Sequence, residues 1–588
     1  MLIPVTQSRW FDLADLLLAL ACALAWAFIG SWGWVILAVS LLPWAVRIGA
    51  GRFPFRRTAL DAPILLFLLT AGIGLWAAYD RSAAWEKFWW LVAASRLYYA
   101  LAGQRRENFF AAATLVTGTA ALLCLLFLLA FDWAAHPLLG PIDRIGVRWM
   151  ALRPGLPLPA PEPDFIGGLA AMLLPLALVM ALAAYRHRDH ARLAVHLATL
   201  LAFGLGLLMS AERPAWIGLM LAGSLWLGWQ GCRWLAGRLK RRAETIAVLG
   251  LLVILAAGSF PGLALWQHGA RRGSMPGRVD EVVNGAHLAA SYPLIGGGLS
   301  ATAGLYSRYI LGIPYLYIPN IRNQYLNIGI EQGLPGLAAA IWLFAGALLG
   351  MLRHPPATPG AADAFGACRW AVGLGIVVFG WHGLMEDVAY SSWGAVLLLI
   401  LPGLAAALQA PAAKRRVAIR WRVAAAAAAA ILIAAALRPL MALWHANLGA
   451  VLMSRVQLAG WPEQLIDGER LLSVTGPAER QFEQALRWQA QPTANYRLGL
   501  LANERRDFAR ANAYLLAAFE QRPGHRGIRK ALGYSYAWTG QIDAAGQTLE
   551  TIPEAAYELS IYAQWWASQG LNDLSDYARQ TAGRLETK

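Results

Sequence analysis

Residues 266–336 read WQHGARRGSMPGRVDEVVNGAHLAASYPLIGGGLSATAGLYSRYILGIPYLYIPNIRNQYLNIGIEQGLPG, a polar stretch between two long apolar runs. It contains no lysine, and its arginines are Arg271, Arg272, Arg278, Arg308 and Arg322. Because a guanidinium group offers a planar fork of donors that suits paired phosphate oxygens, such a cluster beside a membrane suggests a phosphate-bearing lipid. The whole chain is rich in arginine and poor in lysine, so composition alone explains these residues equally well.

The rest of the chain is strongly hydrophobic. Of its 588 residues 58% are apolar, 27 are tryptophan, and the mean hydropathy is +0.46, which is typical of a polytopic membrane protein and excludes a soluble globule. The net charge of +16 lies in short clusters between apolar runs, so we expect it to orient the chain in a membrane and not to bind nucleic acid. Residues 1–9 are polar and precede two successive apolar runs, so we expect no cleaved signal peptide. The four cysteines lack metal-ligand spacing, and we expect no disulfide, metal or other cofactor.

Apolar runs long enough to cross a bilayer predict about thirteen transmembrane helices. They begin near Leu13, Trp32, Pro63, Trp85, Phe109, Ile166, Ala194, Ala215, Ile246, Leu334, Ala371, Trp393 and Val423. Alternate connections carry the basic clusters, and all of these fall on one side. By the positive-inside rule the N-terminus is therefore cytoplasmic, and the C-terminal tail lies on the far face of the membrane.

After the last apolar run the chain becomes polar and repetitive. Leu498 and Gly499 recur as Leu532 and Gly533, a constant offset of 34 that is typical of tetratricopeptide repeats, in which paired helices stack through small residues. Residues 478–492 are typical of the second helix of an earlier repeat, and residues 555–585 of a shorter terminal one. We expect an all-α protein with two parts: a membrane domain over residues 1–441, with its polar loop at about 267–324, and a helical solenoid over residues 442–588.

Three polar features interrupt the membrane part. Glu212 and Arg213 break one long apolar stretch, so they lie at the membrane interface or face a polar cavity. The Pro-rich connection at residues 131–165 is either a solvated loop or a segment that contacts substrate. Within residues 278–290 the valines and alanines recur at helical spacing, which predicts a short amphipathic helix with Arg278, Glu281 and Asn284 away from its apolar face.

The motifs SAERPAWIGL, PGRVDEVVNGAHLAASYPLIGGGLSA and IRNQYLNIGIEQGLPGL occur in this order, and together the chain resembles the O-antigen ligase and polymerase superfamily, which includes bacterial O-oligosaccharyltransferases. The resemblance covers roughly residues 13–408. It implies a GT-C type fold in the bacterial inner membrane and inverting, metal-independent transfer of a glycan from an undecaprenyl-diphosphate-linked donor on the periplasmic face. Carried over by position, Arg213 and Arg278 would bind the donor diphosphate, with Arg272 a further candidate.

The chain departs from the family pattern at one position. Where the family usually has His-Asn, this sequence has Arg322 followed by Asn323. A guanidinium group stays protonated, so Arg322 cannot be a general base, although it can bind diphosphate or stabilise the leaving group. Other candidates for the base are Glu212, Asp280, Glu331 and His382, and the last of these shares a helix face with Glu386.

Two classes of function follow from the sequence. The first is a membrane glycosyltransferase that transfers the lipid-linked glycan to lipid A core, as in lipopolysaccharide synthesis, to a protein hydroxyl, or to another glycan, as a polymerase would. The second is a non-catalytic scaffold that binds lipid-linked glycan, for which the loss of the histidine is the best support. In either case the solenoid would bind a partner protein or the acceptor, or cap the membrane domain.

Overall fold

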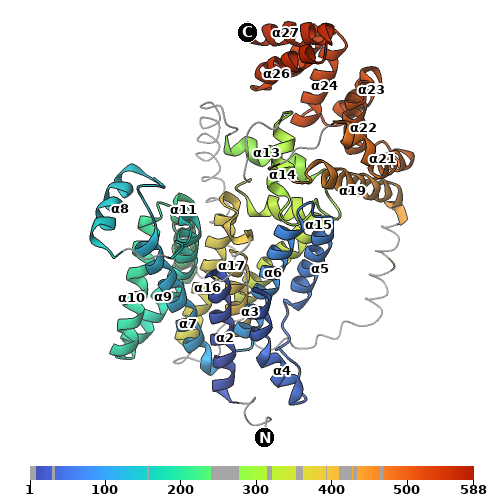
Figure 1. The fold of residues 1–588 in the computed structure, drawn as a ribbon. Helices are drawn as coiled ribbons and strands as arrows, with labels where there is room; N and C mark the ends of the chain where they lie inside the picture. Colours follow the sequence, from blue (N-terminus) through green and yellow to red (C-terminus); the bar gives the residue numbers. More distant parts are fainter. Residues whose placement is uncertain are drawn as a thin grey trace.

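Helices make up the described part of the chain. The computed structural model describes residues 8–28, 33–154, 158–239, 277–313, 321–352, 362–391, 394–409, 427, 434–463 and 468–587. Within these ranges there is no strand, so the predicted all-α fold class is confirmed. The first described helix and the last one lie toward opposite ends of the molecule (Figure 1).

The helices fall into three groups along the chain. The apolar group contains α2 (Arg9–Phe28), α3 (Gly33–Ser40), α4 (Leu42–Gly49), α5 (Asp61–Ala77), α6 (Arg81–Ala102), η2 (Arg106–Asn108), α7 (Phe109–Ala130), α8 (Gly140–Leu152), α9 (Pro163–Arg186), α10 (His190–Met209), α11 (Arg213–Leu239), α15 (Gln324–Leu352), α16 (Ala362–Met385), η3 (Val388–Tyr390) and α17 (Ala395–Leu408). The loop helices are α13 (Arg278–Ala289) and α14 (Thr302–Ile310). The C-terminal group contains α19 (Leu437–Gln457), α20 (Gly468–Val474), α21 (Gly476–Trp488), α22 (Pro492–Glu504), α23 (Phe508–Gln521), α24 (Arg526–Trp538), α25 (Ile542–Leu549), α26 (Ala555–Ser568) and α27 (Asn572–Glu586).

Among the described residues, six helices are long and apolar enough to cross a membrane: α2, α7, α9, α10, α15 and α16. Shorter apolar helices lie at Gly33–Gly49, Asp61–Ala77 and Ala395–Leu408. The multi-pass class is therefore confirmed, whereas the number of thirteen spans is not. The spans predicted from Ile246 and Val423 lie outside the described residues.

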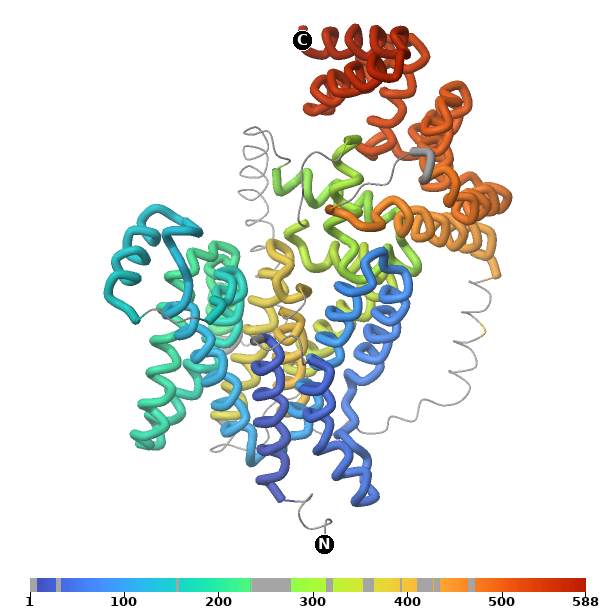
Figure 2. Tube along the Cα trace, viewed as in Figure 1, coloured from blue at the N-terminus to red at the C-terminus, as the bar shows by residue number. Residues whose placement is uncertain are grey.

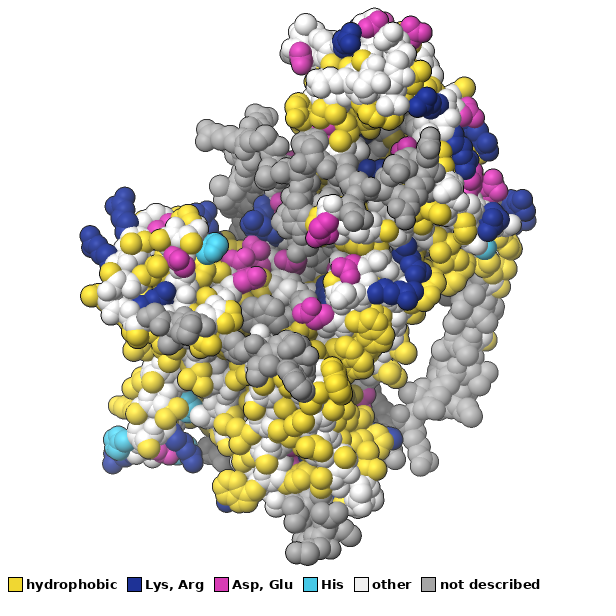
Figure 3. Space-filling model, in the orientation of Figure 1, with side chains coloured by type: hydrophobic (Ala, Val, Ile, Leu, Met, Phe, Trp, Pro, Cys, Tyr) yellow, Lys and Arg dark blue, Asp and Glu magenta, His cyan; other side chains and the backbone are white. Residues whose placement is uncertain are grey.

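The apolar helices pack into a bundle in which α17 lies against α6, α9 lies against α10 and α16, and α15 lies against α5. Several charged side chains inside this bundle are paired, as expected where water is excluded. Arg96 of α6, 2% exposed, forms an ion pair with Asp15 of α2, and Arg47 Nη1 lies 2.9 Å from the other carboxylate oxygen of Asp15. On the face seen in Figure 3, hydrophobic side chains cover much of the lower half, and most charged side chains gather above them.

The Pro-rich connection at residues 131–165 contains a helix, α8, that its composition did not predict. The helix is tied to the end of α7, because Trp149 Nε1 donates a hydrogen bond to the Leu128 carbonyl at 2.7 Å. Several of its apolar side chains remain exposed, including Ile145 and Leu152. This exposure is compatible with either role suggested for the connection, a solvated loop or a segment that contacts substrate.

Helix α13 forms where it was predicted, but the prediction of its buried face was wrong. Val282 and Val283 are 38% and 44% exposed, while Asn284 and Leu288 are buried. The reason is close packing against the start of α15: a Cβ on Gly285 would lie 2.9 Å from a side-chain carbon of Leu326. The glycine lets the helix approach on this side, and the valines turn outward.

The glycine triplet after α13 is a packed turn. Gly296 and Gly298 have φ of 74° and 112°, and a Cβ on Gly296 would lie 2.2 Å from the Glu331 carbonyl oxygen, so only glycine fits there. Gly297 N donates to the Ile330 carbonyl oxygen at 2.6 Å. Asn447 of α19 completes the turn: its Oδ1 accepts hydrogen bonds from the backbone of Leu294 and Ile295. The triplet therefore joins α15 and α19 to the loop.

The C-terminal helices stack in pairs and curve above the loop helices (Figure 2). The offset of 34 reappears as packing, because a Cβ on Gly499 would lie 2.6 Å from Leu515 and one on Gly533 would lie 2.4 Å from Leu549. The α22–α23 and α24–α25 pairs are thus each held by a glycine in the first helix and a leucine in the second. In the irregular first unit, Gly449 of α19 makes the equivalent contact with Phe482 of α21.

Candidate functional site

The candidate site lies where α9, α11, α13, α15 and α16 meet. Glu212, in the short connection between α10 and α11, is buried, and so is His382 near the end of α16. His382 Nε2 lies 4.0 Å from Glu212 Oε1, and neither atom has a hydrogen-bond partner among the described residues. Two of the four sequence candidates for the proton acceptor are therefore neighbours across 170 residues of chain.

A pair of glycines in α9 makes this approach possible. A Cβ on Gly167 would lie 2.4 Å from Glu212 Cβ, and one on Gly168 would lie 2.9 Å from His382 Cε1. Any larger side chain would push the carboxyl group or the imidazole out of place. The sequence analysis did not identify Gly167 and Gly168 as site residues. Nothing in the segment from Phe165 to Leu169 distinguishes these glycines from the ordinary small residues of a membrane helix.

The carboxyl group of Glu212 is in an unfavourable environment for a negative charge. Burial, together with the nearby carboxyl groups of Asp164 and Glu386, raises its pKa to about 9, while Arg278 acts in the opposite direction. Glu212 therefore holds a proton near neutrality. Asp164, in the first turn of α9, belongs to this site, although the sequence showed it only as one charge among several in the connection at residues 131–165.

Arg278 opens α13 and reaches across to the end of α16. Its Nη2 lies 2.9 Å from Glu386 Oε1, and its Nη1 donates a hydrogen bond to the Met385 carbonyl. The side chain of Arg278 is 43% exposed, whereas that of Glu386 is 6% exposed. Burial raises the pKa of Glu386 to about 7, although Arg278 acts to lower it. This carboxyl group thus accepts or loses a proton close to neutral pH.

The other two described arginine candidates are exposed. Arg213 follows Glu212 directly and begins α11, and no ion pair joins it to any other residue the structure describes. Arg322 lies close enough for its charge to act on both Glu281 and Glu386. Arg272 lies outside the described residues. Arg322 and Arg278 thus both act on the carboxyl group of Glu386, and Arg213 is adjacent in sequence to Glu212.

Asn323 and Asn327 hold the start of α15 against the end of α16. Asn323 Oδ1 accepts hydrogen bonds from the backbone of Tyr325 and Leu326, and its Nδ2 donates to the Leu384 carbonyl at 3.0 Å. Asn327 Nδ2 donates to Asp387 Oδ2 at 2.8 Å. The residue that follows Arg322 therefore caps a helix and fixes the position of the segment that carries His382 and Glu386.

Glu331 lies in a separate environment. Its Oε2 accepts a hydrogen bond from Lys87 Nζ at 2.7 Å, and its Oε1 accepts one from Thr302 at 3.1 Å. Lys87 also lies 3.8 Å from the centroid of the Tyr390 ring. The carboxylate is engaged in a buried ion pair that joins α6, α14 and α15. Asp280, a further candidate, is exposed on α13.

No group of three or more His, Cys, Asp or Glu side chains placed to hold a metal ion is found among the described residues. The carboxyl groups of the site face Arg278, Arg322 or one another, and the imidazole of His382 faces Glu212. The arrangement offers arginine donors for an anion and, next to them, two buried groups that can exchange a proton.

Two parts of the chain match known families. Residues 197–341 match the O-antigen ligase family, and residues 502–569 match the tetratricopeptide repeat family. The first match covers Glu212, Arg213, Arg278 and Arg322 but ends before His382. No curated protein is significantly similar to the chain. The resemblance noted in the sequence is therefore confirmed over residues 197–341, and the tetratricopeptide prediction is confirmed over residues 502–569.

Proposed function

We propose that the protein transfers a glycan from an undecaprenyl-diphosphate-linked donor to an acceptor, as an O-antigen ligase or O-oligosaccharyltransferase. The match of residues 197–341 to the O-antigen ligase family supports this proposal. The observation that carries this proposal is the Arg278–Glu386 ion pair beside the buried Glu212–His382 pair. The reaction is inverting and needs no metal. It takes place on the periplasmic face of the bacterial inner membrane, with the N-terminus in the cytoplasm.

The donor diphosphate replaces Glu386 as the partner of Arg278. A pKa near 7 supports this exchange, because Glu386 can take up a proton when the more highly charged diphosphate arrives. The guanidinium of Arg278 then offers two parallel donors to phosphate oxygens. Arg213, which follows Glu212 in the sequence, and Arg322, whose charge acts on Glu386, are both exposed; they neutralise the remaining charge and so stabilise the diphosphate as it leaves the sugar. We assign Arg272 to the same diphosphate-binding group.

The acceptor hydroxyl loses its proton to His382. Arg322 cannot take this role, and Glu212 already holds a proton near neutrality because of its raised pKa. His382 Nε2 lies 4.0 Å from Glu212 Oε1, beyond hydrogen-bonding distance, and has no hydrogen-bond partner among the described residues, so it is free to accept this proton. Glu331 acts by positioning, since its carboxylate is held by Lys87.

We divide the chain into a transferase domain over residues 1–441 and a periplasmic solenoid over residues 442–588. The solenoid binds the acceptor or a protein partner. The acceptor is lipid A core, a protein hydroxyl or another glycan, and a polymerase acts on the last of these. Identification of the molecule that loses its glycan in a deletion strain distinguishes these three.

The test is the Arg278→Ala variant, with Arg579→Ala as a matched control on an exposed face of α27. We expect Arg278→Ala to lose at least about 100-fold in transfer rate, the scale seen when one donor to a developing negative charge is removed. The control should retain the wild-type rate, and both proteins should reach the membrane in equal amounts. Normal transfer by Arg278→Ala would refute the assignment of this site.

A non-catalytic scaffold is the second candidate, and the arginine at position 322 favours it. The purified protein would then bind a lipid-linked oligosaccharide without releasing undecaprenyl diphosphate. Release of that product by the purified wild-type protein, and not by His382→Ala, would exclude the scaffold.

A further inference from the structure

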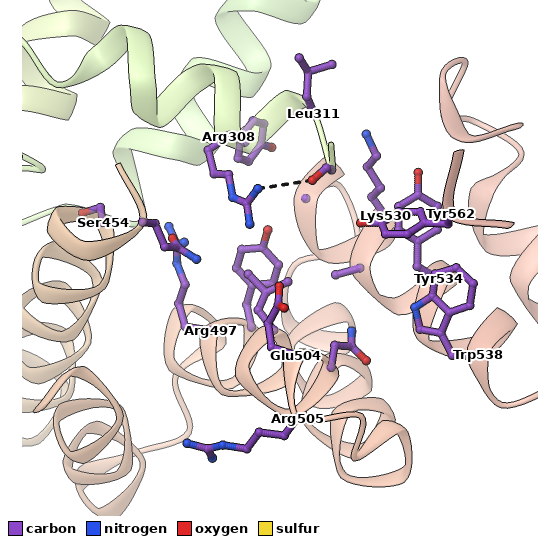
Figure 4. Close-up of a pocket in the computed structure, with 18 of the residues that line it drawn as sticks. Arg308, Leu311, Ser454, Arg497, Glu504, Arg505, Lys530, Tyr534, Trp538 and Tyr562 are labelled. Carbon is purple, nitrogen blue, oxygen red and sulfur yellow. Dashed lines mark hydrogen bonds between the residues drawn. The ribbon is translucent and has the colours of Figure 1, made fainter. Parts of the chain in front are cut away.

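A cavity of about 850 Å³ lies between the loop helices and the solenoid. Leu288, Arg308 and Tyr309 line it from the loop, Ser454 and Gln457 from α19, and Arg497, Tyr534 and Trp538 are among the residues that line it from the solenoid. Figure 4 shows Arg308 pointing into the space above Glu504, with Tyr534, Trp538 and Tyr562 on one side. The volume is in the range of roughly 300–1,000 Å³ that is typical of sites for small ligands.

The cavity has an excess of positive charge. Of its cationic side chains, Lys530 lies 2.7 Å from Glu554 and 2.8 Å from Glu558, and Arg505 lies 2.6 Å from Glu479, so both are neutralised. Three others have no carboxylate partner among the described residues: Arg308, Arg497 and Arg506. Glu504 is the carboxylate that lines the cavity beside them. An anionic ligand would complete this balance.

Arg497 shows that part of this positive charge lies in the interior of the protein and not on its surface. The residue is 8% exposed. Its Nη2 donates to Tyr292 OH at 3.1 Å, but its Nε has no hydrogen-bond partner among the described residues. A buried guanidinium without a counter-ion costs folding free energy. Such a residue is expected where a ligand supplies the missing charge.

One wall of the cavity is aromatic. The ring of Trp538 lies edge-on to Tyr562 at 5.3 Å and to Trp566 at 5.6 Å, and Arg506 lies over the Trp566 ring at 5.6 Å. Gln457, Asn503 and Gln569 add amide groups around it. Sugar rings pack their C–H faces on aromatic rings and direct their hydroxyl groups to amides and arginines, whereas an anion alone needs no aromatic wall.

We propose that this cavity binds an acidic oligosaccharide, a short glycan that carries a carboxylate or a phosphate group. The proposal rests on the proposed function, because the bound glycan would be part of the donor or acceptor chain. The same loop joins the two sites: Leu288, in the helix that Arg278 opens, lines the cavity. The solenoid thus selects the glycan, and the membrane part transfers it.

Binding to the purified full-length protein, measured by calorimetry, tests this proposal. The probes are tetragalacturonate, maltotetraose with one phosphate group, and maltotetraose itself. We expect one or both acidic probes to bind at least tenfold more tightly than the neutral one, and the stronger probe identifies the acidic group. The Arg308→Gln/Arg506→Gln and Trp538→Ala variants should each weaken binding at least tenfold, while Arg579→Gln should not change it.

The double variant changes only partly or fully exposed side chains, so it keeps the test valid if Trp538→Ala does not fold. The Arg278→Ala variant should bind the acidic probe normally even though it transfers no glycan, which separates this proposal from the proposed function. The proposal would be overturned by equal binding of acidic and neutral probes, by no binding of any probe, or by unchanged binding of the acidic probe to the double variant. It would also be overturned if tetraglutamate, an acidic peptide, bound more tightly than the acidic sugars.

Discussion

The buried ion pair between Lys87 and Glu331 gives the sharpest stability prediction. The side chains are 7% and 3% exposed, and their charged atoms lie 2.7 Å apart. Replacement of Lys87 with methionine keeps the length of the side chain but leaves the Glu331 carboxylate with neutral side-chain donors, among them Thr302. Removal of one partner of such a pair costs about 3–5 kcal/mol, because the other charge stays buried without compensation.

The double variant Lys87→Met/Glu331→Gln removes the charge that the single variant leaves behind. We therefore expect it to be more stable than Lys87→Met alone, so the two substitutions should couple strongly. Unfolding in mixed SDS micelles measures the difference in free energy, and Glu86→Gln, at an exposed position of the same helix, is the control. If Lys87→Met unfolds like the wild type, or if the two substitutions are simply additive, the reasoning fails.

Two further predictions concern the site and the solenoid. Gly167→Ala should displace Glu212, at a cost of about 1–3 kcal/mol in stability, and should lower the transfer rate at least tenfold. Gly118→Ala is the control, because a Cβ there meets nothing within 4 Å, and it should transfer at the normal rate. Equal transfer rates for the two variants would contradict this account. Burial, His287 and nearby arginines lower the pKa of His525 to about 3. Because the unfolded chain binds a proton at His525 more readily, the stability that the neutral imidazole gives to α24 is fully present above pH 6.5 and falls as the pH drops toward 3. At pH 5 the loss is about 2 kcal/mol. Hydrogen exchange in α24 measures this loss, and His525→Asn, which keeps a side-chain acceptor for the Ile528 amide, should remove the pH dependence; a persistent dependence would assign it to another group.

Periodic features were predictable from the sequence. The repeat of Leu498-Gly499 at Leu532-Gly533 corresponds to two equivalent helix contacts, because a stacked repeat needs a small residue at the same place in each unit. The helical character of the membrane part was also predictable, because long apolar runs indicate membrane-spanning helices. In both cases the signal lies within a short window of sequence.

Pairings between distant segments were not predictable. Glu331 was a candidate base because its neighbours in sequence belong to a family motif, but its ion pair with Lys87 joins residues 244 positions apart. The faces of α13 were assigned from hydrophobicity, yet Gly285 decided the outcome because a helix can approach most closely where a side chain is missing. Gly167 likewise acquires its role only when Glu212 lies against it.

The carboxamide of Asn447 has a consequence for any attempt to separate the two parts of the chain. It lies in α19, six residues beyond position 441, and it is 0% exposed while bonded to the backbone of Leu294, Ile295 and Gly296. A protein shortened at position 441 would lose the acceptor for two amides that follow α13, so the turn at Gly296 would be damaged in the excised fragment. Conversely, a force or a partner that shifts α19 would act directly on the turn at Gly296, which packs against Glu331 of α15.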